Sequence, residues 1–323
     1  MSDITHTRRL VKAGSSSHTL ALPKEWLERH KLGKGDSVIV VEKSTELLIL
    51  PSARSMTAST TEITITVDGK AFDTIQREIT AAYLNNYGSI VLQGKSIATQ
   101  AKQLRETLHD LVGLEIVEQT GTRVVAKDLL NVEEVSIDRT IRRMDMMLRS
   151  LLQDAINDQA TSEGSQLRDQ DINRLFFLCQ RLLRRAIEDP SMAGRLGMSG
   201  RKMLLTWQMI HHLENIADGA ARLPELLAPL KKSKTEMMML IKHSEKYYLD
   251  AMKAYYDGNR ELGDSVASQW WAVTTKQMDV VRKHPESAAL AWQLNVMASL
   301  TADIARTVID GAIAASQTSA AGQ

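Results

Sequence analysis

The sequence predicts a mixed, mainly helical protein that begins with a β-rich part, continues with a small α/β module and ends in two three-helix units. The first 50 residues place short extended runs between turn residues, and the next segment alternates strand-like with helix-like stretches. From Ile137 onward, apolar residues recur at the 3.6-residue spacing of a helix. The expected boundaries are residues 1–52, 62–132, 136–224 and 233–316, followed by a disordered tail at 317–323.

The N-terminal part is expected to hold four short strands and one helix. The strands are expected at 9–12, 19–22, 37–41 and 47–50, and the helix at 24–30, after Pro23. Turns at 14–17 and 32–36 and a polar hairpin connector at 42–46 separate them. So few residues, apolar on several sides, cannot bury their own faces, which favours dimerisation.

The rest of the chain follows a small polar linker at 51–61. In the α/β module we expect strands at 63–67, 89–93, 114–119 and 123–126, and helices at 71–84 and 99–111. The six later helices are expected at 137–159, 168–188, 200–222, 234–257, 259–283 and 285–316. Two successive sets of three helices of similar length indicate an internal duplication.

Composition narrows the class of protein. The chain has 323 residues, enough for about two domains, and its 43% apolar and 24% charged residues are ordinary for a globular protein. Its one cysteine, Cys179, excludes an internal disulfide and favours a reducing compartment. Apolar runs stay short of the roughly 18 residues that a membrane span needs, and the first ten residues lack a hydrophobic signal segment. We therefore expect a cytoplasmic protein without a membrane span.

Positive charge is concentrated near the N-terminus. The whole chain has 40 basic and 39 acidic side chains, whereas residues 1–55 hold nine basic and six acidic ones, a net charge of +3. Seven cations lie within 27 positions: Arg8, Arg9, Lys12, Lys24, Arg29, Lys31 and Lys34. They are consistent with salt-sensitive contacts to DNA phosphates or, equally, with ordinary surface charge.

Motifs for enzyme chemistry are weak. Gly94-Lys95-Ser96 follows a strand, but the first glycine of a phosphate-binding loop is missing because Ser89 stands in its place, so a simple turn is expected. The sequence has no nucleophile-elbow motif, and Cys179 lies at helical spacing among apolar residues, as a core residue does. Trp270 and Trp271 are interpreted as bundle packing. We expect no enzymatic activity.

An acidic helix face is the strongest candidate site. His211, Glu214 and Asp218 are spaced by three and four residues, so they share one helix face and could converge on a cation. Glu214 and Asp218 share this face with the apolar residues Trp207, Ile210, Ala217 and Ala221, and carboxylates buried among apolar groups need a partner or a metal. The alternative is a solvated or salt-bridged face, because a second apolar stripe, comprising Met209, Leu213, Ile216 and Ala220, could be the core face.

The second helical set carries a related stretch. Asp303 lies 85 residues after Asp218 and can pair with Arg306, which can in turn pair with Asp310. An ordinary ion-pair ladder on a helix surface explains this stretch.

Three N-terminal segments resemble the AbrB (SpoVT/AbrB, MazE-like) swapped-hairpin domain. They are residues 8–14 (RRLVKAG), 18–27 (HTLALPKEWL) and 32–38 (LGKGDSV), and they occur in the family's order. This resemblance implies a dimeric DNA-binding head in which Arg8, Arg9 and Lys12 contact DNA; we add Lys24 from the same basic run.

The helical part resembles PhoU, whose two three-helix units each carry an acidic ExxxD motif on the third helix. Glu214 and Asp218 match that motif, and Asp303 matches the end of the second copy, where Ser299 replaces the acidic partner. The resemblance implies that Glu214, Asp218 and Asp303, with His211 beside them, bind a divalent or ferric metal ion (Fe, Zn, Mg or Mn).

The combination is similar to archaeal phosphate uptake regulators, and it implies a DNA-binding, homodimeric transcriptional regulator of phosphate uptake. One alternative is a PhoU-like adaptor that contacts a phosphate transporter component or a sensor kinase and uses its head only to dimerise. A toxin–antitoxin-like repressor is a third possibility, disfavoured because antitoxins are short. DNA binding that falls steeply with salt separates the regulator from the adaptor.

Overall fold

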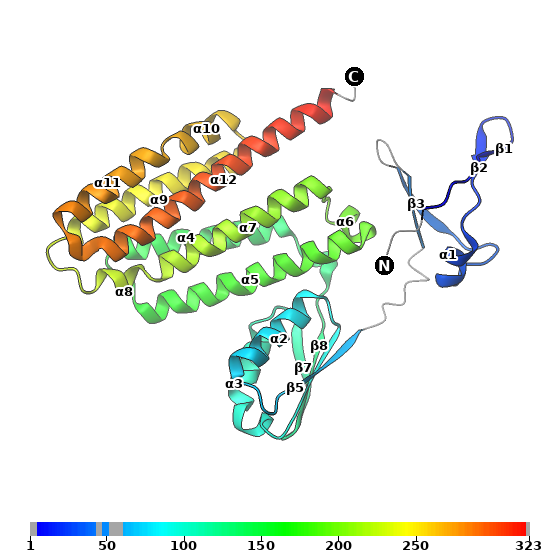
Figure 1. Cartoon of the computed structure of the whole chain (residues 1–323), viewed down its shortest axis with the longest axis horizontal. Coiled ribbons are helices and arrows are strands. Elements are labelled where there is room, and N and C mark those ends of the chain that lie inside the picture. Colours follow the sequence, from blue (N-terminus) through cyan, green and yellow to red (C-terminus); the bar gives the residue numbers. More distant parts are fainter. Residues whose placement is uncertain (1–4, 43–46, 52–60, 321–323) are drawn as a thin grey trace. The chain divides into compact units, whose positions relative to one another are not determined.

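The computed structural model describes residues 5–42, 47–51 and 61–320, and the chain divides into two units, 1–60 and 61–323. Most of the expected linker, most of the hairpin connector and the last three residues lie outside the described residues. Mainly helical architecture with small sheets is confirmed (Figure 1). Within the described residues, no helix is both long and apolar enough to span a membrane.

The N-terminal unit consists of two separate antiparallel hairpins and a short helix. The first hairpin pairs β1 (Val11–Ala13) with β2 (Ser17–Thr19), and the second pairs β3 (Val38–Glu42) with β4 (Leu47–Pro51). Helix α1 (Lys24–Arg29) lies between them in the sequence. Gly14 adopts φ +84°, a conformation that glycine takes without strain, and so permits the tight first turn.

The α/β module has two helices on one face of a four-stranded sheet. Its elements are β5 (Glu62–Thr66), α2 (Phe72–Leu84), β6 (Ser89–Gln93), α3 (Ile97–His109), β7 (Leu114–Gln119) and β8 (Arg123–Asp128). The strand order is β5-β6-β8-β7, with β5 parallel to β6 and the other pairs antiparallel. Alternate strand residues such as Ile90 and Leu92 pack against Ile75 and Leu104 of the helices and form one apolar core.

The Gly94-Lys95-Ser96 segment is a turn, as the sequence indicates. Asp68 accepts hydrogen bonds from the backbone N–H groups of Lys95 (2.9 Å) and Ser96 (2.7 Å). These bonds lower the pKa of Asp68. The protein's own carboxylate therefore occupies the N–H groups that a phosphate would need.

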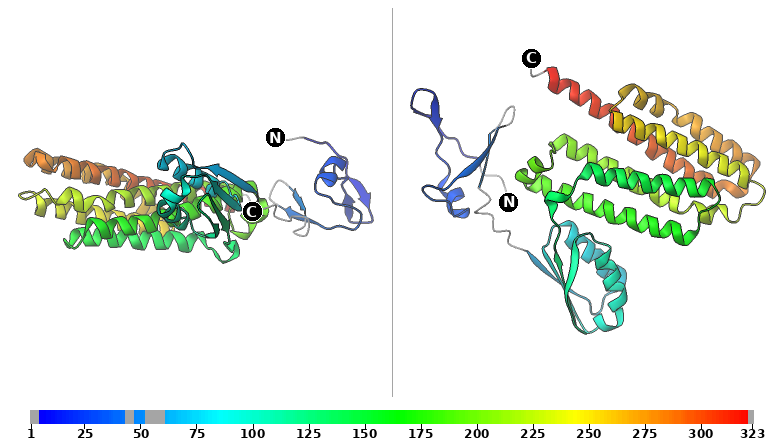
Figure 2. Two further views of the ribbon diagram at one scale, coloured as in Figure 1. Left: turned by 90° about the horizontal axis from the view of Figure 1, so that it is seen from below. Right: turned by 180° about the vertical axis from the view of Figure 1, so that it is seen from behind.

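The helical part comprises nine α-helices among the described residues. They are α4 (Ile137–Ile156), α5 (Ser162–Glu188), α6 (Pro190–Arg195), α7 (Gly200–Ala221), α8 (Leu223–Leu227), α9 (Lys234–Asp257), α10 (Arg260–Ser268), α11 (Trp270–Lys283) and α12 (Ala288–Ala320). The two expected sets correspond to α4, α5 and α7 and to α9, α10–α11 and α12. Both sets share one continuous apolar core, and Figures 1 and 2 show the yellow-to-red helices alongside the green ones.

Several helix boundaries differ from expectation. The helix expected at 259–283 is interrupted at Gln269, and the short helices α6 and α8 were not expected. Helix α5 begins at Ser162 rather than 168 because Thr161 caps it, its hydroxyl accepting from the N–H of Gly164 at 3.1 Å. Helix α12 continues to Ala320, past the expected end at 316 and into the segment expected to be a disordered tail.

The close packing of α7 against α12 depends on Gly219. A Cβ at this position would stand 2.3 Å from Nε2 of Gln293 and 3.0 Å from Cγ of Met297. Gln293 and Met297 are both buried, so they have little room to move.

We expect Gly219→Ala to be less stable than Gly200→Ala by about 1–3 kcal/mol, the usual cost of overpacking. Gly200 lies on the same helix with open space around it, so the control removes the helix-propensity difference between glycine and alanine. Urea unfolding followed by circular dichroism measures both variants. Equal stability would contradict the tight α7–α12 contact.

Candidate functional site

The predicted DNA-binding cations lie on the exposed surface of the N-terminal unit. Arg8 and Arg9 directly precede β1, and Lys12 stands on β1 opposite His18. Within the described residues, Arg8, Arg9 and Lys12 form no ion pair. Lys24 begins α1, and its Nζ lies 3.6 Å from Oε1 of Glu28, with both side chains largely exposed. A pair this exposed contributes little, so the Lys24 charge stays available.

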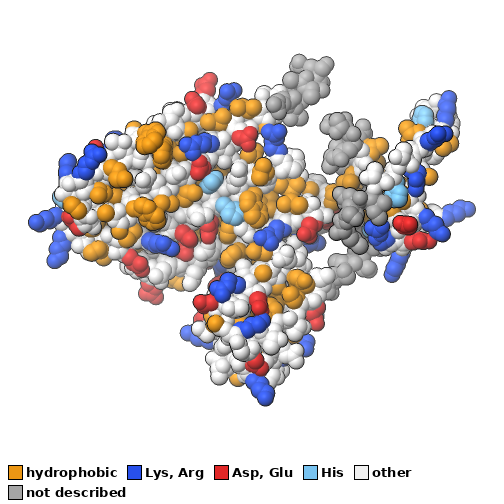
Figure 3. All heavy atoms as spheres, viewed as in Figure 1, with side chains coloured by type: hydrophobic (Ala, Val, Ile, Leu, Met, Phe, Trp, Pro, Cys, Tyr) orange, Lys and Arg blue, Asp and Glu red, His pale blue; other side chains and the backbone are white. Residues whose placement is uncertain are grey.

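The same unit leaves its apolar side chains in solvent. Among residues 5–40 and 47–51, none is buried. Six large apolar side chains are 42–67% exposed: Leu10, Val11, Leu20, Ile39, Val40 and Leu47. Ile39 and Val40 are neighbours in one strand and so point to opposite faces, which means that both faces of β3 need a covering surface. Figure 3 shows orange apolar and blue basic side chains together on this unit.

The acidic face predicted on α7 is present, and a third carboxylate joins it. Glu214 and Asp218 lie on α7, and Asp169 of α5 lies close enough to influence both charges. Asn173 donates to Oδ2 of Asp169 at 3.3 Å, while Oδ1 is buried without a hydrogen-bond partner among the described residues. The stripe Met209, Leu213, Ile216 and Ala220 is buried in the core, and so are Ile210 and Ala217 on the face of the carboxylates, which stand half-buried beside them.

Burial and the charges of neighbouring carboxylates make Asp169 and Glu214 weaker acids than exposed carboxyl groups. Burial, then the charge of Asp218, raises the pKa of Asp169 to about 7, and a hydrogen bond shared with Asp218 adds to the shift. Burial, then the charges of Asp218 and Asp169, raises the pKa of Glu214 to about 7. Near neutral pH the cluster therefore holds protons that an exposed carboxylate would have lost.

His211 is engaged elsewhere. Its Nδ1 lies 2.7 Å from the carbonyl oxygen of Trp207, and its Nε2 lies 3.0 Å from Nε2 of Gln180. A carbonyl oxygen only accepts, so Nδ1 carries the proton and donates to Trp207, and Nε2 accepts from the amide of Gln180. Both ring nitrogens predicted as candidate metal ligands are thus occupied by protein groups.

Asp303 belongs to a different contact, where α12 faces α7. It accepts a hydrogen bond from Arg306, as the ion-pair interpretation predicts. Its charge also acts on His212. Burial lowers the pKa of His212, and the charge of Asp303 partly restores it. Asp303 does not figure among the groups that shift the pKa of Glu214.

The described residues contain no ready-made metal site: no three His, Cys, Asp or Glu side chains stand close enough to hold one ion. The nearest approach to such a site is the carboxylate cluster Asp169, Glu214 and Asp218, which a cation would have to draw closer together. Sequence spacing identified Glu214 and Asp218 but missed Asp169, because a contact between two helices leaves no periodic signal.

Comparison with known proteins adds no assignment. No family model, no curated protein and no solved structure matches this chain.

The carboxylate cluster predicts how stability depends on pH. Unfolded carboxyl groups have pKa values near 4, so between pH 4 and pH 7 the folded state binds more protons than the unfolded state. Stability from these groups is therefore present at low pH and decreases as the pH rises through about 7.

We expect Asp169→Asn combined with Glu214→Gln to raise the thermal midpoint at pH 8 relative to wild type and to reduce the difference between pH 5 and pH 8. A change of about 1 kcal/mol in the free energy of unfolding shifts the thermal midpoint by roughly 2–4 °C in a protein of this size or somewhat smaller. Glu188→Gln combined with Glu225→Gln is the control, because it removes two exposed charges from α5 and α8. If the thermal midpoint of the cluster variant depended on pH as that of the wild type does, Asp169 and Glu214 would not be the source of this dependence.

Proposed function

We propose that this chain is a homodimeric DNA-binding regulator of phosphate uptake, with the N-terminal unit contacting DNA and the helical part binding a cation or docking a partner. The observation that carries the proposal is the N-terminal unit itself. It combines exposed cations with apolar strands that the described part of the unit covers only in part.

Dimerisation is supported by the physical state of the two hairpins. Two-stranded sheets are marginal in water, and β1–β2 and β3–β4 do not pair with each other. Intertwining with a second copy would cover Ile39 and Val40 on both faces of β3. This is the arrangement that the resemblance to AbrB domains implies.

DNA binding is supported by the position of the cations. Arg8 and Arg9 lead into β1 and Lys12 lies on it, so dimerisation would bring six such cations onto one assembly. Cations in this number give strong, salt-dependent attraction to phosphates and position a protein on DNA, whereas base choice needs groove contacts.

We expect duplex DNA from the gene's own upstream region and from phosphate-transporter promoters to bind in a strongly salt-dependent manner. Arg8→Ala/Arg9→Ala/Lys12→Ala should lower the slope of log affinity against log salt by about 5 when six phosphate contacts per dimer are lost. Fluorescence anisotropy at several salt concentrations measures the slope.

The matched control is Arg77→Ala/Lys102→Ala/Lys127→Ala, which removes three exposed cations from the α/β module. It should leave the slope unchanged. If the wild-type protein bound these DNA duplexes no more tightly than the non-specific level, roughly micromolar or weaker, specific DNA binding would be refuted and the adaptor alternative favoured.

The cation-binding part of the proposal concerns Glu214 and Asp218, with Asp169 as the third carboxylate. Oxygen ligands of this type suit Mg²⁺ and Mn²⁺, and carboxylates also bind zinc and iron. Burial, and after it the repulsion between carboxylates, raises the pKa values of Glu214 and Asp169, and a bound cation would oppose both effects.

We expect Glu214→Gln/Asp218→Asn to weaken Mn²⁺ binding by more than the 10–100-fold that loss of an outer-shell partner typically costs. Electron paramagnetic resonance of free Mn²⁺ at pH 8 measures binding. Asp303→Asn serves as the comparison, because Asp303 is paired with Arg306 and should not matter. Equal binding by wild type and the double variant would show that the metal assignment is wrong.

A further inference from the structure

The two edges of the sheet in the α/β module differ in how well they are protected against pairing with another strand. At one edge, β7 carries Glu115 and Glu118 and is distorted by an irregularity between Ile116 and Glu118. Charges and bulges are the usual protection against pairing with another strand. At the other edge, β5 (EITIT) pairs regularly with β6 and carries one charged residue, Glu62, which accepts a hydrogen bond from Ser89 on β6 at 3.1 Å. The β5 edge is therefore unprotected.

The backbone of β5 presents a regular set of outward-facing groups. The carbonyl of Thr61 accepts from β6, and the N–H of Val67 donates to Gln93 at 2.9 Å, so odd-numbered residues face β6. Because a parallel strand alternates, the N–H and C=O groups of Glu62, Thr64 and Thr66 point to the free edge. Within the described residues, no strand other than β6 pairs with β5.

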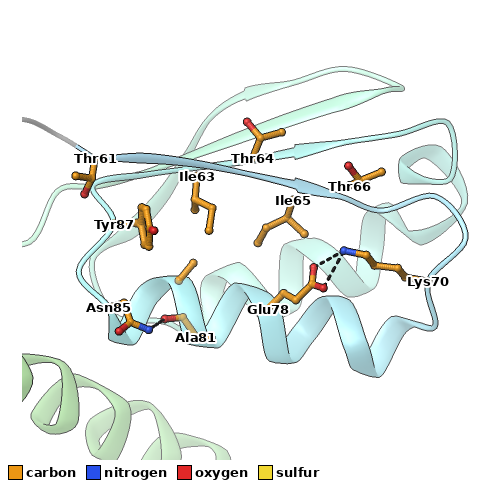
Figure 4. Close-up of a pocket in the computed structure, with 11 residues that line it drawn as sticks. Thr61, Ile63, Thr64, Ile65, Thr66, Lys70, Glu78, Ala81, Asn85 and Tyr87 are labelled. Atoms are coloured by element: carbon orange, nitrogen blue, oxygen red, sulfur yellow. Dashed lines mark hydrogen bonds and ion pairs between the residues drawn. The ribbon is translucent and has the colours of Figure 1, made fainter.

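A groove of about 740 Å³ lies beside this edge, between β5 and α2 (Figure 4). Its apolar lining includes Ile63, Ile65 and Tyr87, which Figure 4 shows directed toward α2, whereas Thr64 and Thr66 point away. The charges in the groove, Lys70 and Glu78, neutralise each other at 2.6 Å. A groove whose two charges cancel, beside a strand with a single carboxylate at one end, favours an uncharged occupant over a charged ligand.

We propose that β5 pairs antiparallel with β5 of a second copy across a two-fold axis at Thr64, which joins the two sheets into one of eight strands. This register is self-complementary. It places Thr64 opposite Thr64 and Glu62 opposite Thr66, so all three outward-facing residues of each copy exchange both hydrogen bonds. It also keeps the two Glu62 carboxylates about four residues, or ~13 Å, apart.

The apolar side chains support the same register. Ile63 of each copy lies opposite Ile65 of the second copy, in the closer, non-hydrogen-bonded type of pair. Four isoleucines then continue the floor of the groove across the axis, beneath the two α2 helices. The proposal uses residues of the α/β module alone and does not depend on how the N-terminal unit dimerises.

Cysteine cross-linking of the full-length chain tests the pairing and its register. Thr64→Cys treated with a short-spacer bismaleimide should give at least about tenfold more cross-linked dimer than Val117→Cys, another exposed site on the opposite edge. Coexpressed Glu62→Cys and Thr66→Cys chains should cross-link to each other, whereas either variant alone should not. The native Cys179 is buried and does not interfere.

A second variant tests the hydrogen bonds. Thr64→Pro removes an N–H that points to the free edge and leaves the bonds between β5 and β6 in place, so the module should fold and the link between Glu62→Cys and Thr66→Cys should disappear. Thr64→Val keeps the N–H and should keep the link. Cross-linking at Thr64 no greater than at Val117, or self-linking of Glu62→Cys equal to its link with Thr66→Cys, would overturn the proposal. Occupation of the edge by a peptide from another protein would give the first of these results.

Discussion

The buried guanidinium of Arg181 is the interaction on which the arrangement of residues 61–323 depends. Arg181 lies on α5, is 2% exposed, and donates to both carboxylate oxygens of Asp128 at the end of β8, at 3.1 and 2.5 Å. It also donates to Asn86 at 3.3 Å and lies 4.4 Å from the ring centre of Tyr83. A buried charge is tolerated only with such partners, so separating the sheet from the helices would leave the charge of Arg181 without them. The two parts therefore behave as one unit.

This interaction links two segments that the sequence indicates separately, the α/β module at 62–132 and the helical part after it, within one compact unit. The residues concerned are far apart in the chain, and neither Arg181 nor Asp128 has a local feature that indicates burial. Phe177, one turn before Arg181, packs against both apolar cores and completes the junction. Periodicity detects which face of an element is apolar, but it does not show which other element will cover that face.

The bounds of helices and strands were predictable where turn residues mark both ends. The strands β6 and β7 and the helix α9 have the expected bounds, because turn residues flank them on both sides. The break at Gln269 was not predictable, because neither glycine nor proline marks it. On α7, spacing alone placed Glu214 and Asp218 on one face, whereas the engagement of His211 with Gln180 depends on how α5 packs beside α7.

Helices α7 and α12 differ in how they hold their carboxylates. On α12, Asp303 is neutralised by Arg306 on its own helix, and the position that the PhoU resemblance aligns with Glu214 is Ser299. On α7, Glu214 and Asp218 stand together and Asp169 approaches from α5, although their burial and repulsion cost stability at neutral pH. Helix α12 packs into the same apolar core without such a cluster, so packing alone does not require one. Clusters that cost stability in this way are characteristic of functional sites.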